Sequence, residues 1–125
     1  MKTNTTTLAT IYALAYKARY DYHEKEAFRK AGMSFLRALA KRLALVKGTF
    51  SIRFNAGGIA VEGDPILHHD KFYINLATGF MGSGYWRTCK GQKDCSGGQN
   101  RDASPSYTVE SFAAEIAKVA EISVK

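Results

Sequence analysis

Residues 24–54, EKEAFRKAGMSFLRALAKRLALVKGTFSIRF, decide the fold, because the spacing of their apolar residues changes from helical to alternating. In the first part, apolar side chains recur at three- and four-residue steps, which predicts a helix over 24–46. Gly48 is its expected C-cap, and Gly32 inside it either permits close packing or marks a kink. Over 50–54 the period becomes two, which predicts a half-buried strand. The chain therefore passes from a long helix directly into a sheet.

The remaining sequence extends this pattern in both directions. A helix is expected from Thr7 to about Tyr22, with Thr6 or Thr7 as its N-cap. Downstream, alternation predicts short strands over 59–61, 66–69, 72–77 and 85–89, the first of which would pair with 50–54 through a turn at 55–58. Turn residues stand at 62–65 and 70–71, residues 90–106 read as a loop, and Thr108 is placed to cap a final helix.

Consecutive strands joined by tight turns favour an antiparallel meander. We therefore predict an α+β fold with two N-terminal helices, a four- to five-stranded antiparallel meander, and one C-terminal helix packed on one face of the sheet. The chain has 125 residues, of which 46% are hydrophobic, so a single domain over 1–125 is expected. The other face of the sheet would be either solvated or a binding surface.

The net charge of +7 is unevenly distributed along the chain. Residues 25–53 carry many cations and only one carboxylate, Glu26, whereas 105–125 carry three glutamates against two lysines. Such a basic field attracts polyanions, most often nucleic acid. No apolar run reaches the roughly 20 residues that cross a bilayer, and the first residues lack the apolar region of a secretion signal. We therefore expect a soluble protein that is not secreted.

The segment 85–100 combines a strand-like start with a polar loop rich in glycine, amides and lysine. A small domain that commits so many residues to one loop is expected to use it for binding. Mixed aromatic and cationic side chains suit single-stranded nucleic acid, whose bases stack on rings while cations hold phosphates. The candidates around the loop are Tyr85, Trp86, Arg87, Lys90, Lys93 and Arg101. Alternation puts Tyr85 and Arg87 on one face of the strand and Trp86 on the other, so only one of the two aromatics shares the face of Arg87. Either Tyr85 or Trp86 would provide the stacking, and the other could belong to the core.

A second group of candidate binding residues lies in the helix over 24–46. Its members are Lys30, Arg37, Lys41 and Arg42, which are close together on one side of the helix and would form a stripe that follows a phosphate backbone.

Metal and catalytic chemistry find weaker support in the sequence. His68 and His69 are adjacent, so on a strand they point to opposite faces, and Cys89 and Cys95 are too far apart for the usual paired zinc ligands. Either cysteine could act as a nucleophile with a histidine as base, but no signature of a cysteine enzyme is present. The glycine-rich stretches lack the phosphate-loop motif. We therefore expect no enzymatic activity, metal or cofactor, and two reduced thiols.

The loop sequence Arg87-Thr88-Cys89-Lys90-Gly91-Gln92-Lys93-Asp94, followed by Gly97-Gly98-Gln99-Asn100, resembles that of a family of small, mostly uncharacterised tailed-bacteriophage proteins. The sequences of 55–61 and 72–76 fit the same pattern, so the resemblance covers roughly residues 48–100. The family pattern has an aromatic residue where Cys95 stands, so it implies no role for a cysteine pair. It implies a phage origin, expression inside an infected bacterium, and no catalytic residues.

The leading hypothesis is a non-enzymatic phage accessory protein that acts in the host cytoplasm by binding nucleic acid. The alternative is an inhibitor that binds a host protein, such as a defence, replication or transcription enzyme, with aromatic and arginine side chains as anchors. A zinc- or cysteine-dependent enzyme is the third possibility.

Overall fold

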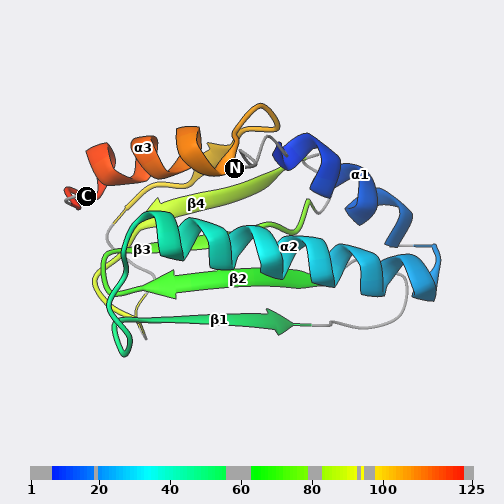
Figure 1. The fold of residues 1–125 in the computed structure, drawn as a ribbon, viewed down its shortest axis with the longest axis horizontal. Helices are drawn as coiled ribbons and strands as arrows, with labels where there is room; N and C mark the ends of the chain where they lie inside the picture. The colour runs from blue at the N-terminus through cyan, green and yellow to red at the C-terminus, as the bar shows by residue number, and fades with distance from the viewer. Residues whose placement is uncertain are drawn as a thin grey trace, which may run out of the picture.

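A computed structural model describes residues 7–18, 20–55, 63–78, 83–92, 94 and 98–122. The elements follow in the order α1 (Leu8–Ala18), α2 (Tyr22–Arg42), β1 (Phe50–Asn55), β2 (Asp64–His69), β3 (Phe72–Asn75), β4 (Gly84–Thr88), β5 (Arg101–Ala103) and α3 (Val109–Val119). Figure 1 shows the helices as one layer in front of the sheet.

The five strands form a single sheet in the order β1-β2-β3-β4-β5, and every neighbouring pair is antiparallel. This confirms the predicted α+β meander with two N-terminal helices and one C-terminal helix. The tight turn at Asp70–Lys71 between β2 and β3 is also confirmed.

The partner of β1 is β2, with Phe50 opposite His69 and Asn55 opposite Asp64. The predicted pairing of 50–54 with 59–61 lies outside the described residues. Two other predictions for this region are wrong in detail. The turn predicted at 62–65 fails because Asp64 and Pro65 belong to β2. Pro65 is tolerated there because only its carbonyl is needed, as the acceptor for the Leu76 N–H at 3.0 Å. The predicted loop 90–106 contains β5, whose three residues are too few to show alternation.

The predicted end of the long helix is also wrong, because α2 stops at Arg42 and not near Gly48. Its C-cap is Leu43, and Ala44 follows in the left-handed region with φ of 54°. The Ala44 N–H bonds the Lys41 carbonyl and the Leu45 N–H bonds the Ala40 carbonyl, which is the Schellman arrangement. The sequence hid this end because glycine usually takes the position of Ala44.

The helix starts agree better with the sequence. Thr108 caps α3 in a capping box with Ser111, as expected. Asp21 caps α2 in an extended conformation and so separates α2 from α1. For α1, Thr6 lies outside the described residues, and the first-turn N–H groups of Leu8 and Ala9 bond the carbonyls of Tyr107 and Pro105, both at 2.9 Å. A segment near the end of the chain therefore completes the first helix.

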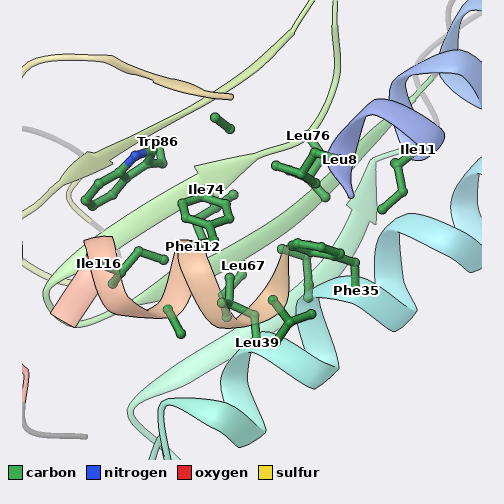
Figure 2. Close-up of a cluster of buried hydrophobic side chains, with 14 of the residues drawn as sticks. Leu8, Ile11, Phe35, Leu39, Leu67, Ile74, Leu76, Trp86, Phe112 and Ile116 are labelled. Atoms are coloured by element: carbon green, nitrogen blue, oxygen red, sulfur yellow. The ribbon is translucent and has the colours of Figure 1, made fainter. Parts of the chain in front are cut away.

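The core lies between the helix layer and the sheet (Figure 2). Trp86, Ile74 and Leu67 rise from the sheet to meet Phe112 of α3 and Leu39 of α2, and all five are at most 1% exposed. Gly32 permits close packing and does not mark a kink, because a Cβ there would lie 2.7 Å from Cγ of Pro65. This contact brings α2 down onto β2.

Candidate nucleic-acid interface

The register of the strands divides the sheet into two chemically different faces. Leu67, Ile74 and Trp86 are mutual cross-strand partners on the face that the helices cover. The alternate residues point the other way and form two rows, which no described helix covers, although Ile66, His68 and Asn75 among them are buried. One row is Ser51, His68, Tyr73 and Arg87, and the other is Arg53, Ile66, Asn75 and Tyr85. We call this the uncovered face.

The structure separates the two aromatic candidates for base stacking. Trp86 is 1% exposed and packs edge-to-face on Phe112, with ring centroids 6.0 Å apart. It belongs to the core and has no ring face to offer a base, so its burial contradicts the prediction that Trp86 could provide the stacking. The Arg101 guanidinium lies 5.8 Å from its ring centre, so this candidate cation covers the edge of the core. Tyr85 is half-buried on the uncovered face and is the stacking candidate that remains.

Tyr85 belongs to an aromatic group on the uncovered face, and the other members of this group were not among the predicted site residues. Its ring centre lies 6.1 Å from that of Tyr73, and Tyr73 in turn meets His68 edge-to-face at 5.0 Å. Arg87 stands beside Tyr73 and hydrogen-bonds the Gly98 carbonyl. The alternation over 72–77 contained the signal for Tyr73, since it placed this ring opposite the core residues.

His68 lies at one end of this group. Its Nε2–H donates to the Gly91 carbonyl at 2.9 Å, and Nδ1 is buried with no hydrogen-bond partner among the described residues. Burial lowers the pKa of His68, outweighing the bond to Gly91, because an added proton on Nδ1 would have no acceptor. His69 points to the other face, stacks on Phe72 at 4.9 Å and accepts the Lys71 N–H, and burial lowers its pKa as well.

The basic candidates on α2 occupy its solvent side. Lys30, Arg37 and Lys41 are exposed, whereas Arg42 is partly buried and forms an ion pair with Glu110 of α3 at 2.6 Å. Arg37 and Lys41 have no carboxylate partner among the described residues. Three of the four predicted cations are therefore available to a ligand, and the fourth joins two helices.

The structure does not bring all the predicted site residues together. The α2 cations lie outside the helix layer, and Tyr85 and Arg87 lie beyond the sheet, so the domain separates them. Lys90 is exposed in the loop that follows β4. This loop is held at one end of the domain by Gln92, whose side-chain amide donates to the Gly48 carbonyl and to Asp70, both at 3.0 Å. Lys93 lies outside the described residues.

Metal and cysteine chemistry gain no support from the geometry of the described residues. No group of three or more His, Cys, Asp or Glu side chains among them is placed to hold a metal ion. Sγ of Cys89 lies 3.3 Å from the His69 carbonyl oxygen, so it meets the histidine backbone and not an imidazole. Cys95 lies outside the described residues, and so does its possible pairing with Cys89.

The fold and the exposed groups together define a small two-layer α+β domain with a basic helix on one side and an aromatic sheet face on the other. Comparisons with models of known protein families, with curated protein sequences and with solved structures gave no match. Within the described residues, no helix has both the length and the apolar character needed to span a bilayer.

Proposed function

We propose that this protein binds nucleic acid without catalysing a reaction, and that the exposed cations of α2 hold the sugar-phosphate backbone. The observation that carries the proposal is the solvent side of α2, where Arg37 and Lys41 project without a carboxylate partner among the described residues. With Lys30 they span the 12 residues from 30 to 41 of one helix, a length of about 17 Å, which matches several successive phosphates of a strand.

The uncovered face supplies a separate contact in this proposal. Bases of a single strand stack on aromatic rings, and Tyr73 and Tyr85 provide two neighbouring rings with Arg87 beside them. Since this face lies across the domain from α2, a duplex would use α2 alone, and a flexible single strand could reach either surface. The resemblance to tailed-phage accessory proteins adds the proposal that the protein works in the cytoplasm of an infected bacterium.

Salt dependence of DNA binding tests the proposal. Fluorescence anisotropy with labelled duplex DNA should show log affinity falling linearly with log salt, with a slope of about −3 or steeper if three cations meet phosphates. The double variant Arg37→Gln/Lys41→Gln should reduce the magnitude of that slope by about 2. As the matched control, Lys17→Gln/Lys118→Gln removes the same charge from exposed positions on α1 and α3. Equal effects of the two double variants, or no binding at moderate salt, would contradict the proposal.

The loop requires its own test. Neutralising Lys90 and Lys93 together should weaken binding if the loop contributes to the interface. Parent-like affinity of this variant, with the α2 variant impaired, would restrict the site to the helix.

Inhibition of a host protein is the second candidate function. It is favoured by the outer edge of β1, whose backbone groups no described residue bonds.

A further inference from the structure

We propose that the outer edge of β1, together with the groove beside it, is a docking site for an extended, carboxylate-bearing segment of a partner protein. The segment would add a strand to the sheet next to β1. The proposal does not require nucleic-acid binding, because it depends on backbone groups of β1 and on an apolar groove, although that groove shares Arg37 and Lys41 with the proposed nucleic-acid site.

Alternate residues of β1 turn their backbone groups away from β2. In an antiparallel pair, alternate residues turn both their N–H and C=O towards the partner strand. The Asp70 N–H bonds the Thr49 carbonyl at 3.0 Å, so Thr49 and Asp70 form a hydrogen-bonded pair of the ladder. Every second pair of β1 and β2 residues after them is therefore hydrogen-bonded as well. Phe50, Ile52 and Phe54 therefore turn their N–H and C=O groups outwards. β1 is the first strand of the sheet, and no described residue bonds these groups.

Within the part of the chain that the structure describes, β1 lacks the usual protection of an edge strand. Natural edges are commonly blocked by proline, by lysine, by a bulge or by a covering segment. The sequence of β1, FSIRFN, contains neither proline nor lysine, and its pairing with β2 runs without a bulge through six successive residues. Its single charged side chain, Arg53, points to the uncovered face and not along the edge.

A groove lies between β1 and the end of α2. It has a volume of about 470 Å³ and is lined by Ala40, Ala44, Leu45, Phe50 and Ile52, with Arg37 and Lys41 as its charged members. The same two strand residues that present outward backbone groups, Phe50 and Ile52, also form its apolar floor. An added strand would therefore gain main-chain hydrogen bonds and a pocket for its alternate side chains, which is the usual basis of strand addition.

The charge of the groove identifies the partner. Arg37 and Lys41 at the groove and Arg53 on the other side of β1 all favour carboxylates on the incoming strand. A second copy of this chain is disfavoured as the occupant, because pairing β1 with β1 would bring the same cations of two molecules together, each with net charge +7. An acidic, partly apolar segment of another protein satisfies both the groove and its cations.

The test uses a synthetic peptide of about eight residues in which pairs of valines alternate with pairs of glutamates, so that each face of the added strand carries both, and which is long enough to pair with the whole of β1. By NMR, the amides of Phe50, Ile52 and Phe54 should exchange about tenfold more slowly when the peptide is bound. The amides of Ser51 and Arg53, which already face β2, should change little. Binding should weaken with salt and in Arg37→Gln/Lys41→Gln, whose positions are exposed and leave the fold intact.

The matched control is the same peptide with every second backbone amide N-methylated, which keeps its charge and removes its ability to pair as a strand. Equal binding of the two peptides would overturn the proposal, as would peptide binding that leaves the three β1 amides unprotected. Protection that arises without peptide, and increases with protein concentration and salt, would assign the edge to a second copy and would equally overturn it. None of these outcomes depends on whether the protein binds DNA.

Discussion

On the covered face of the sheet, Leu67, Ile74 and Trp86 are buried in one apolar cluster, whereas neighbouring positions of the same strands carry His68, Tyr73 and Arg87 on the uncovered face. The covered face holds the three helices. The uncovered face carries tyrosines, a histidine and arginines. The comparison teaches that residues inside and outside the apolar cluster alternate along the same strands, so adjacent substitutions should have different consequences.

The largest expected difference is between two adjacent aromatics of β4. Replacing Trp86 by alanine should lower the free energy of unfolding by about 3–5 kcal/mol, because it leaves a cavity beside Phe112. Replacing Tyr85 by alanine should cost about 1 kcal/mol or less, since it removes only a half-buried cross-strand contact. Urea unfolding of both variants measures the difference. Similar losses would show that the uncovered face is as much a part of the core as the covered one.

Acid should affect both faces through their buried histidines. The pKa values of His68 and His69 are lowered in the folded protein, so the unfolded chain takes up protons first as the pH falls. Stability is therefore complete above the unfolded pKa of about 6.5 and declines below it, by at most about 1.4 kcal/mol per pH unit for each histidine, until the folded pKa is reached. Urea midpoints between pH 7.5 and 5 would follow this decline.

The variant His68→Leu separates the two contributions to the acid decline. It should leave the part that belongs to His69. NMR titration of the imidazole signals provides the direct check, and a His68 ring that titrated at its ordinary value would show that the uncovered face admits water.

The smallest expected effect concerns how closely α2 approaches the covered face. Gly32→Ala should lower the free energy of unfolding by about 1 kcal/mol net, because the clash with Pro65 outweighs the gain in helix propensity. Ser34→Ala on the solvent side of α2 is the control and should be neutral or slightly stabilising. Thermal melts of the two variants can be compared directly, and a stabilised Gly32→Ala would show that α2 can lift from the sheet at no cost.

The sequence predicts the elements well where periodicity is long and poorly where a single contact decides. Three helices and the alternation of β1, β3 and β4 follow from the spacing of apolar residues, but alternation alone left open whether Tyr85 or Trp86 faces the core. The end of α2 could not be predicted because Ala44 takes a conformation that favours glycine. β5 could not be predicted because only its pairing with β4 makes it a strand.

The candidate site was predictable only as a set of residue types. The exposed cations of α2 follow from helical spacing, but the ion pair that removes Arg42 from the set needs the packing of α3 against α2. Likewise, a free strand edge is defined by the order of strands in the sheet. That order places β1 at the edge of the sheet, a position that no local pattern in the sequence of β1 predicts.

The bonds from Leu8 and Ala9 to the carbonyls of Tyr107 and Pro105 also set a sequence of events during synthesis. A ribosome releases α1 early, while the carbonyls that satisfy its first turn are still to be translated. The nascent chain can form the helical pair α1–α2 and the meander from local contacts, but α1 keeps unsatisfied N–H groups until the residues after β5 emerge. The two ends of the chain are thus joined last, and a ribosome stalled before residue 105 would hold a domain whose first helix is still frayed.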